Sequence, residues 1–499
     1  MYGKKPRIRH RKSWKYLVLV SLVSLAAFTL IMETFFLLGP RGGTYIGLHK
    51  SIGLAWRNYF SNHLLPEEAI SDEDLLHHAL LREVCIEDTN VSLPWQFGSP
   101  GKQGIDGTAT NSHVLMHETD QDLLQKLRQC PDIDIFLPSS ARTYGYCEDA
   151  AAYVKYLESR LLPEWIMTAK LYNPDLKRKV DYFDLCPKTP MLFLDHHWGG
   201  MTESPRWPKD KPVYMMANIE IMELTPMHFL RADAVLCKSF ECYKRVMKWF
   251  EQYGNRRDAQ VFYTKHTSSS LDLFALKRLG KDAVAPKDFS DVRFVHTAGA
   301  SQSKGTREVL ECWVETPGLP PLDVYIDREP FNRLLPLSFR NRIPRSKSPV
   351  TLHLGMLKPL DYSKVISEAS FVVNPSYGEG YGHIINQARA TGAVIVTTDM
   401  SPMNEIIIGN GTGMLVSVQR RKHPMVVLGG NYRGTLGLEN VDGLVASFAG
   451  SDVCSVIERV VQSSYGQRVE MGFKARRQYH ADTKYFAKTM QELRNFAKR

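Results

Sequence analysis

Cysteine is scarce in this chain, and its spacing is uninformative. The 499 residues contain eight cysteines and no C-x-x-C pair, which excludes the common zinc-binding patterns and argues against a small scaffold built on disulfides. An oxidising compartment would permit one or two disulfides, but the sequence does not show which cysteines pair. The sequence also lacks internal repeats and low-complexity tracts, which excludes a solenoid.

Excess charge of one sign is confined to the start of the chain. The formal net charge is +10, and residues 1–15 hold seven Lys or Arg and no acidic residue. Removing those seven charges leaves +3 over the remainder, so the main support for a nucleic-acid-binding function is lost. The pI of about 9.0 is therefore a signal of membrane topology.

Residues 16–38 form a long apolar run after this basic tail. The run contains one carboxylate, Glu33, and a bilayer core takes about 20 apolar residues, so the run is long enough to span. Its basic flank should stay in the cytoplasm. The run exceeds the core of a cleaved signal peptide, so we expect an uncleaved signal anchor of a single-pass type II membrane protein. Sequons at Asn90 and Asn410 fit a lumenal glycoprotein of the Golgi or endoplasmic reticulum in a eukaryotic host.

A glycine-rich loop lies between two predicted strands near residue 380. The apolar run at 370–375 predicts a buried parallel strand, and SYGEGYG follows it at 376–382. The three glycines let the backbone adopt positive φ and approach a ligand closely. A predicted helix at 383–391 and a second strand at 393–399 complete a βαβ unit.

A helix that begins at this loop favours an anion there. Free amide groups and the positive end of the helix dipole bind phosphate. Glu379 would repel a phosphate that it faced, so we expect its carboxylate to accept hydrogen bonds from neighbouring hydroxyl groups. A diphosphate beside a polyhydroxyl group is a nucleotide sugar.

This block resembles the donor-binding half of glycosyltransferase family 4, the group 1 glycosyl transferases. The family shares the pattern P-S-x-x-E-G-x-G, a second Glu eight residues after the first, then G-x-x-V and a Thr-Asp strand end. The matching positions are Pro375, Ser376, Glu379, Gly380, Gly382, Ala388, Gly392, Asp399 and Glu405. In the family the first Glu lies by the sugar and the second binds the ribose. Position 387 is Gln here, and its amide oxygen would accept a ribose hydroxyl hydrogen bond.

The resemblance covers residues 291–416, in the family's order. DVRFVHTAGASQSKGTREVLECW, at 291–313, is similar to the first strand and loop of the family's second domain, where an Arg and a Lys bind the donor diphosphate. Lys304 matches the Lys, whereas Gly299 occupies the Arg position. Ser301 in this loop would replace the lost charge only in part, through neutral hydrogen bonds.

The first half of the chain matches the family only in outline. Strands are predicted at 130–138, 164–171 and 189–200, and a helix at 146–161. Because ligands bind beyond the carboxyl ends of strands in doubly wound sheets, the acceptor-side candidates are Gly145, Asn218, Glu220 and His266, with His196 and His197 as catalytic candidates beside Glu379.

Each of these residues also has a structural interpretation. A histidine after a strand is more often a hydrogen-bonded structural residue, although family members often carry one at this strand end, close to the transferred sugar. Glu220 also fits a carboxylate at a helix N-terminus. Asp132 and Asp134 form a nominal D-x-D, but they alternate with isoleucine at a predicted strand start, so we expect no metal role.

The expected fold is α/β and of the GT-B type, in which two Rossmann-like, doubly wound domains face each other across a cleft, here preceded by one transmembrane helix. The expected divisions are a cytoplasmic tail (1–15), the anchor (16–38), a stem (39–125), an N-terminal acceptor domain (126–285), a nucleotide-sugar donor domain (286–475) and a final helix that packs back on the first domain (476–499).

The resemblance implies a retaining, metal-independent glycosyltransferase without a cofactor, which moves a hexose from a nucleotide diphosphate sugar to a glycan, protein or lipid acceptor. The expected donor-binding residues are Gly299, Ser301, Lys304, Ser376, Gly380, Tyr381, Gly382 and Gln387. The missing Arg and Gln387 also fit a GT-B pseudoenzyme that binds a nucleotide sugar or glycan without turnover. A secreted carbohydrate-binding module is a third possibility and requires cleavage of the anchor.

Overall fold

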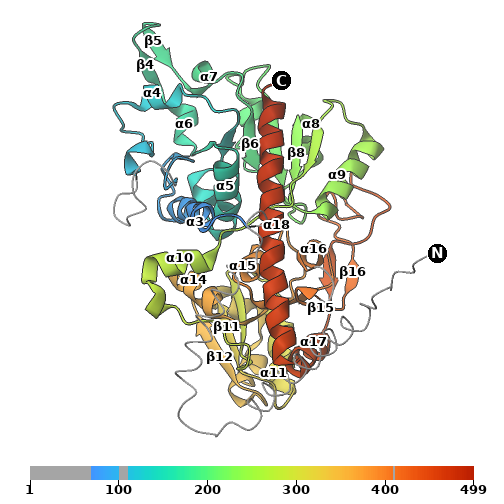
Figure 1. The fold of residues 1–499 in the computed structure, drawn as a ribbon. Helices are drawn as coiled ribbons and strands as arrows, with labels where there is room; N and C mark the ends of the chain where they lie inside the picture. Colours follow the sequence, from blue (N-terminus) through green and yellow to red (C-terminus); the bar gives the residue numbers. More distant parts are fainter. Residues whose placement is uncertain (1–68, 100–110, 408–410) are drawn as a thin grey trace, which may run out of the picture. The chain divides into compact units, whose positions relative to one another are not determined.

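The computed structural model describes residues 69–99, 111–407 and 411–499 (Figure 1), all within one compact unit, Trp56–Arg499. The predicted cytoplasmic tail and transmembrane anchor lie outside the described residues, as does Asn410. In the described ranges, no helix combines the length and apolar character needed to cross a bilayer. Asn90 is exposed on a turn.

The first domain is built on a seven-stranded sheet with the order β1-β3-β2-β6-β7-β8-β9. Its strands are β1 (Leu93–Pro94), β2 (Asp134–Phe136), β3 (Arg160–Leu162), β6 (Met191–Leu194), β7 (Val213–Ala217), β8 (Ala234–Cys237) and β9 (Gln260–Tyr263). Only β1 runs antiparallel to its neighbour. The central strands are buried throughout, as expected for a parallel sheet covered on both faces. The strand order reverses between β2 and β6, where doubly wound sheets bind ligands.

Helices surround this sheet and a short hairpin extends from it. The helices are α3 (Asp72–Glu87), α4 (Leu123–Leu127), α5 (Tyr144–Tyr156), α6 (Trp165–Thr168), α7 (Tyr182–Leu185), α8 (Pro226–Arg231) and α9 (Phe240–Tyr253), and the hairpin strands are β4 (Leu171–Asn173) and β5 (Arg178–Val180). Helix α10 (Leu271–Leu279) follows and packs on α14 (Pro359–Glu368) of the second domain and on α3.

The strand predicted at 164–171 is wrong, because α6 begins there and β3 precedes it. Pro163 separates the two elements, and a proline does not donate to a sheet ladder. A buried ion pair of 2.7 Å between Arg160 on β3 and Asp134 on β2 holds the actual pairing. Asp134 also accepts a hydrogen bond from Tyr182, so this half of the D-x-D motif makes structural contacts.

Residues from the predicted stem contribute to the first domain. Helix α3 packs on α5, and β1 pairs with β3 at the sheet edge. The side chain of Ser71 caps α3 by accepting a hydrogen bond from the Asp74 amide, which is a preferred role for serine.

The second domain contains a six-stranded parallel sheet with the order β12-β11-β10-β13-β14-β15. Its strands are β10 (Phe294–Gly299), β11 (Leu322–Ile326), β12 (Val350–Leu354), β13 (Phe371–Val373), β14 (Val394–Thr398) and β15 (Met414–Val416). Taken in chain order this is 3-2-1-4-5-6, the dinucleotide-fold order, with its reversal between β10 and β13. The βαβ unit expected around residue 380 is present as β13, α15 (His383–Ala390) and β14.

The remaining elements of this domain cover the sheet or form a small hairpin beside it. They are α11 (Thr306–Glu315), α12 (Arg328–Leu334), α13 (Leu337–Arg340), α14 (Pro359–Glu368), α16 (Met403–Ile406), α17 (Gly450–Gln462), and the antiparallel strands β16 (Gln419–Arg421) and β17 (Val445–Ser447).

One long helix, α18 (Tyr465–Ala497), contributes to both cores. Met471 packs in the second domain, whereas Phe486 and Met490 pack in the first. Figure 1 shows α18, in red, running past both sheets. Near its end, Arg494 lies 3.0 Å from Asp132.

Helix α9 of the first domain is held by the second domain at two places. Its first amide groups, those of Phe240 and Glu241, donate to the carboxylate of Glu405 at 2.7 and 2.9 Å, which places a negative charge at the positive end of the helix dipole. Farther along, Arg245 and Trp249 donate to backbone carbonyl groups of the 422–444 segment. The match of Glu405 to the family pattern is therefore an interdomain contact here.

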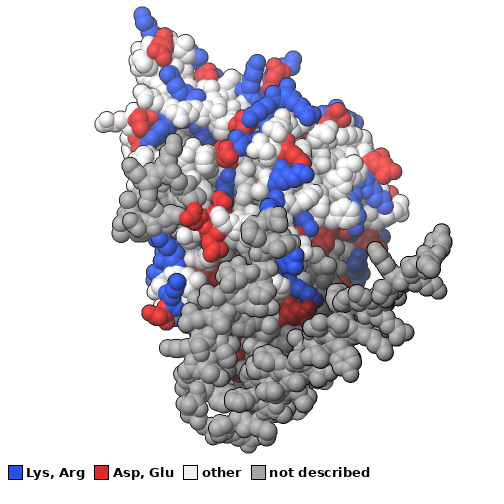
Figure 2. Space-filling model, in the orientation of Figure 1, with Lys and Arg blue, Asp and Glu red and all other residues white. Residues whose placement is uncertain are grey.

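Charges of both signs are mixed on the molecular surface. On the face drawn in Figure 2, Lys and Arg side chains are interspersed with Asp and Glu over the described residues. This distribution agrees with the low net charge that remains once the amino-terminal tail is set aside.

All eight cysteines are paired, so the expectation of one or two disulfides was too low. The pairs are Cys85–Cys147, Cys130–Cys186, Cys237–Cys242 and Cys312–Cys454. Their separations range from 5 to 142 residues, which is why linear spacing did not reveal them.

We expect denatured, unreduced protein to expose no free thiol and reduced protein to expose eight. Alkylation followed by intact mass and non-reducing peptide mapping measures both the count and the pairing. Any other linkage contradicts the structure.

Replacing Cys85 and Cys147 together by alanine should lower the free energy of unfolding by about 4 kcal/mol, because their disulfide closes a loop of 62 residues.

Candidate functional site

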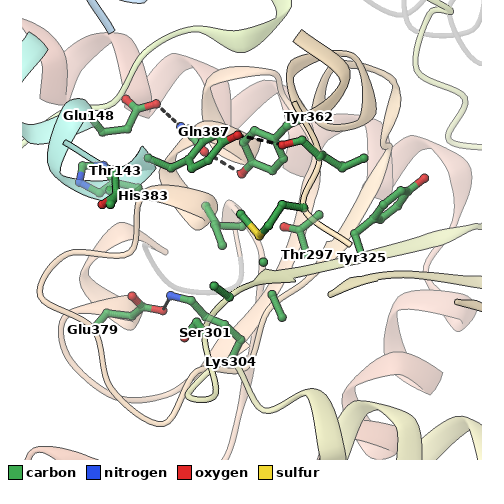
Figure 3. Close-up of a pocket in the computed structure, with 18 of the residues that line it drawn as sticks. Thr143, Glu148, Thr297, Ser301, Lys304, Tyr325, Tyr362, Glu379, His383 and Gln387 are labelled. Atoms are coloured by element: carbon green, nitrogen blue, oxygen red, sulfur yellow. Dashed lines mark hydrogen bonds and ion pairs between the residues drawn. The ribbon is translucent and has the colours of Figure 1, made fainter. Parts of the chain in front are cut away.

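A cavity of about 660 Å³ is lined by residues of both domains (Figure 3). Thr143, Gly145 and Glu148 come from the start of α5 in the first domain. From the second domain come the loop after β10, the loop after β13 and the first turns of α15. These are the positions where the strand order reverses in the two sheets, and both the place and the volume are typical of small-molecule sites.

Two glycines allow the loop after β13 to lie where it does. Gly382 has a φ of 101°, a conformation that other residues rarely adopt, and it directly precedes α15. A side chain at Gly380 would place its Cβ 2.1 Å from Asn218 Oδ1. The loop after β13, referred to below as the donor loop because of its predicted role, therefore contacts the end of β7 in the first domain.

Lys304 and Glu379 form an ion pair in the cavity wall (Figure 3). Lys304 lies in the loop after β10 and Glu379 in the loop after β13, on either side of the strand-order reversal. The hydroxyl of Ser376 donates to the same Glu379 oxygen at 2.5 Å. Gly299 and Ser301 line the cavity beside Lys304.

Gln387 lines the cavity, but its amide oxygen already accepts a hydrogen bond from the Tyr362 hydroxyl at 2.8 Å. Its amide nitrogen donates to Glu148 on α5. Glu148 also pairs with Arg82 and accepts from the Ser269 amide at 2.9 Å. The ribose contact expected of Gln387 would thus have to replace an existing bond. A glutamate at 387 would face the carboxylate of Glu148.

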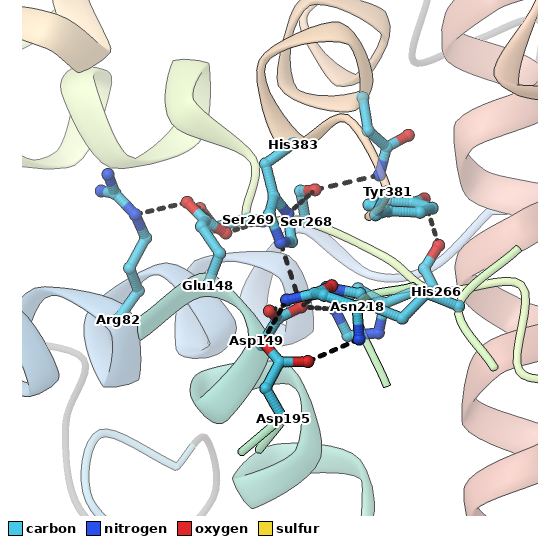
Figure 4. A network of polar contacts seen from close by, with 12 residues as sticks. Arg82, Glu148, Asp149, Asp195, Asn218, His266, Ser268, Ser269, Tyr381 and His383 are labelled. Atoms are coloured by element: carbon cyan, nitrogen blue, oxygen red, sulfur yellow. Dashed lines mark hydrogen bonds and ion pairs between the residues drawn. The ribbon is translucent and has the colours of Figure 1, made fainter. Parts of the chain in front are cut away.

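A second buried carboxylate, Asp149, lies next to Glu148 in the chain (Figure 4). Lys238 Nζ is 2.9 Å from both Asp149 oxygens, and His266 Nε2 and His383 Nε2 lie 2.9 and 3.0 Å from one of them. Burial alone would raise the pKa of Asp149, but Lys238 and the histidines hold it well below its ordinary value. Burial lowers the pKa of His266 to about 4, so this ring is neutral beside Asp149.

This group also has the spacing of a metal site. Among the described residues, Asp149, His266 and His383 present ligand atoms within 4.8 Å of one another. A cation bound there would meet the ammonium group of Lys238, which already occupies both oxygens of Asp149. The cluster is therefore better explained as a buried ion pair with two histidine partners.

The catalytic candidates His196 and His197 follow β6, and two of the acceptor-side candidates, Asn218 and Glu220, follow β7. Asp195 ends β6 and accepts hydrogen bonds of 2.5 Å from both the amide and the side chain of Asn218. The rings of His196 and His197 lie 4.1 Å apart, and Tyr146 packs on His197 at 4.8 Å. A Cβ on Gly380 would lie 2.8 Å from Glu220 Oε1, so this cluster adjoins the donor loop.

Burial shifts the pKa of three groups in this cluster. It raises the pKa of Glu220 to about 8, with the charge of Asp195 adding to the effect. It raises the pKa of Asp195 to about 6 and lowers that of His197 to about 4. At neutral pH, Glu220 is mostly protonated and His197 is neutral.

Four predicted site residues lie differently from expectation. His266 does not face the cavity: it is fully buried and packs against Tyr153 and Phe486. The ring of Tyr381 is buried as well, and its hydroxyl donates to the His266 carbonyl. Ser376 is buried and reaches the site only through Glu379, while Gly145 belongs to the first turn of α5 rather than to a loop.

Sequence patterns missed Glu148, Asp149, Lys238 and His383. No motif marks them, because their partners are far away in the sequence. One signal was available for the first two: an acidic pair inside the otherwise apolar helix CEDAAAYV, since buried carboxylates are paired in folded proteins.

No protein-family model matches the chain, and neither does any curated protein. Among solved structures, a glycosyltransferase from Rickettsia africae ESF-5 is 12% identical, with 74% of this chain and 99% of that chain covered and a TM-score of 0.46. A sucrose-phosphate synthase from Thermosynechococcus elongatus is 13% identical, with 68% and 84% covered and a TM-score of 0.45. An α,α-trehalose 6-phosphate synthase from Burkholderia multivorans is 10% identical, with 62% and 70% covered and a TM-score of 0.44. Likenesses this weak do not carry an activity over, so function has to be argued from the residues of this chain.

Gln387→Glu should destabilise the protein by about 3 kcal/mol or more, because it sets a second buried carboxylate against Glu148. The double variant Glu148→Gln with Gln387→Glu again places one amide opposite one carboxylate, so it should recover more than half of the lost free energy of unfolding. Urea unfolding measures the stability of both variants, and the surface variant Gln129→Glu is the control for adding a carboxylate. A Gln387→Glu protein as stable as wild type contradicts the contact.

Glu220→Gln should flatten the dependence of stability on pH. The folded pKa of Glu220, about 8, lies above its ordinary value of 4.5, so its contribution is complete below about pH 4.5 and is lost as the pH rises through 8. Asp195, Lys238 and Glu379 are the charged groups that act on it. Between pH 6 and 9 the wild-type Tm should fall by about 2 °C more than that of Glu220→Gln. The exposed control Glu223→Gln should show the same change of Tm with pH as wild type. If the Tm of Glu220→Gln also changes with pH as wild type does, the raised pKa of Glu220 is contradicted.

Proposed function

We propose that this chain is a glycosyltransferase that takes its sugar from a nucleotide diphosphate sugar. The observation that carries the proposal is the Lys304–Glu379 ion pair in an interdomain cavity, at the strand-order reversal of a 3-2-1-4-5-6 sheet. A cation for the diphosphate and a carboxylate for sugar hydroxyls lie there side by side.

Binding of the donor exchanges the partners of this pair. A diphosphate at the cavity wall competes with Glu379 for the Lys304 ammonium group, and charge-assisted bonds to phosphate are strong. Glu379, released from Lys304, accepts hydrogen bonds from the sugar hydroxyls. The first-turn amide groups of α15, which begins directly after the glycine loop, add positive potential for the leaving diphosphate.

The acceptor approaches from the first domain. Its hydroxyl oxygen bonds to the anomeric carbon, the bond from that carbon to the diphosphate oxygen breaks, and the hydroxyl proton passes to the departing diphosphate. On this side, Asn218 and Glu220 pack against Gly380, and His196 and His197 follow β6. We propose retention of the anomeric configuration and no metal requirement, with Lys304 and α15 supplying the positive charge.

The disulfides support a location in an oxidising compartment. Every cysteine of the chain is paired, and such extensive pairing is rare in the cytosol. With the predicted anchor at residues 16–38, this supports a type II membrane enzyme whose catalytic domain faces the lumen of the endoplasmic reticulum or Golgi.

One observation favours the alternative of a binding protein without turnover. Arg82 and Lys304 are the Lys or Arg residues of the cavity lining, and both are ion-paired, while Gly299 stands where the family has an Arg. A protein that binds a nucleotide sugar, yet neither transfers nor hydrolyses it with any acceptor, supports this alternative.

Thermal-shift measurements with UDP, GDP and ADP sugars test the donor site. One class should raise the Tm of wild type, because a ligand that binds only the folded state stabilises it. Lys304→Met should weaken that donor by about tenfold or more, and Glu379→Gln should weaken the nucleotide sugar more than the free nucleoside diphosphate.

Lys281→Gln, at an exposed lysine away from the cavity, is the matched control and should bind like wild type. If no nucleotide sugar of any class shifts the Tm, the proposed function is wrong.

A further inference from the structure

Four polar atoms at the carboxyl ends of β6 and β7 are buried and have no hydrogen-bond partner among the described residues. They are His196 Nδ1, His197 Nε2, Asn218 Oδ1 and Glu220 Oε2. Asn218 is only 9% exposed. Most buried polar atoms in native proteins are paired, so a local group of unpaired ones needs an explanation. A ligand that brings hydroxyl groups would supply the missing partners.

These atoms belong to one cluster beside the donor loop. The rings of His196 and His197 lie 4.1 Å apart and tilted, and Tyr146 contacts His197. Asn218 and Glu220 pack directly against Gly380. In this structure Gly380 covers these two side chains, so a ligand reaches them only when the two domains move apart, a motion that is common in enzymes with a closing cleft.

The charges around the cluster are mainly negative. Asp195 acts on Glu220 and Glu223 acts on the neighbouring His197. Glu379 also acts on Glu220, but Lys304 neutralises it in an ion pair. The cation that acts on Glu220 is Lys238, and Asp149 holds its ammonium group with both oxygens. A phosphate or carboxylate would therefore meet repulsion here, whereas a neutral hydroxyl group would meet hydrogen-bond partners.

We propose that this cluster binds the reacting sugar of a neutral glycan acceptor and discriminates against acceptors that carry a phosphate or carboxylate on that sugar. The proposal rests on the proposed glycosyltransferase function and narrows its acceptor. Asn218 Oδ1 accepts a hydrogen bond from an acceptor hydroxyl, and protonated Glu220 donates one. His196 Nδ1 and His197 Nε2, which have no hydrogen-bond partner in the described part of the chain, supply two further hydrogen-bonding atoms.

Nucleotide release tests the proposal, with the donor identified by thermal shift. Methyl glucoside, methyl mannoside and methyl galactoside are compared with the corresponding sugar 6-phosphates. A neutral glycoside should be used with a kcat/KM at least about tenfold above that of its phosphate. A phosphate used as well as its neutral parent, or better, overturns the proposal. Binding of the nucleotide sugar is measured separately by thermal shift. If no nucleotide sugar raises the Tm, the proposed glycosyltransferase function fails, and not only the proposed acceptor.

Where no acceptor sustains turnover, protection of His196 and His197 from diethyl pyrocarbonate, followed by peptide mass spectrometry, reports binding at the cluster. Neutral glycosides should protect the two histidines more than the phosphates do. Stronger protection by phosphates, or none by either set, overturns the proposal.

His197→Arg adds a cation to the cluster, which should attract a phosphate. The ratio of neutral glycoside to sugar phosphate, measured as kcat/KM or as protection of His196, should fall by about tenfold. His113→Arg, at an exposed histidine elsewhere, is the control and should leave the preference unchanged. An unchanged preference in His197→Arg counts against a ligand at this site.

Discussion

The buried carboxylate of Asp149 is the constraint on which the interdomain site depends. It projects from α5 and binds Lys238 at the end of β8, His266 after β9 and His383 at the start of α15. A buried charge deprived of its partner costs about 3–5 kcal/mol, so these elements keep the positions in which the carboxylate is paired. One of them, α15, begins where the glycine loop ends. The placement of Glu379 and of the loop amides therefore follows from an ion pair centred in the opposite domain.

The residue before Asp149 makes a second connection to the same helix. Glu148 binds Gln387, and Asp149 binds His383, four residues earlier on one face of α15. Two adjacent carboxylates thus hold two points one turn apart, which fixes the rotation of α15 as well as its position. Arg82 and Ser269 complete the partners of Glu148. Because Ser269 belongs to the segment that connects the two domains, the same network orders the connection between them.

The sequence predicted what local patterns encode. The strand, glycine loop and helix around residue 380 followed from an apolar run, three glycines and helical spacing, and Lys304 and Glu379 were both assigned to the donor site. Their pairing across 75 residues was not predictable, since no local rule brings the loops after β10 and β13 together. The strand expected at 164–171 failed because apolar spacing around Pro163 does not distinguish a strand before it from a helix after it. His266 was misplaced for a related reason: a strand end indicates the rim of a sheet, but α18 covers this rim with Phe486.

The structure changes the interpretation of Gln387 that the motif suggests. Taken alone, the change from the family's Glu is a lost carboxylate and evidence of decay. In the structure, Glu148 places a carboxylate within hydrogen-bond reach of position 387 from the other domain, held by Arg82. A Glu at 387 would oppose it, so an amide is the residue that this site accommodates. Glu148, on α5 in the cavity lining, supplies a carboxylate close to the one that position 387 lacks. The Gln at 387 is therefore better explained by a carboxylate that has moved to the other domain than by loss of the site. The case for a pseudoenzyme then rests on the loop after β10, where Lys304 is present but Gly299 stands at the position of the family's Arg.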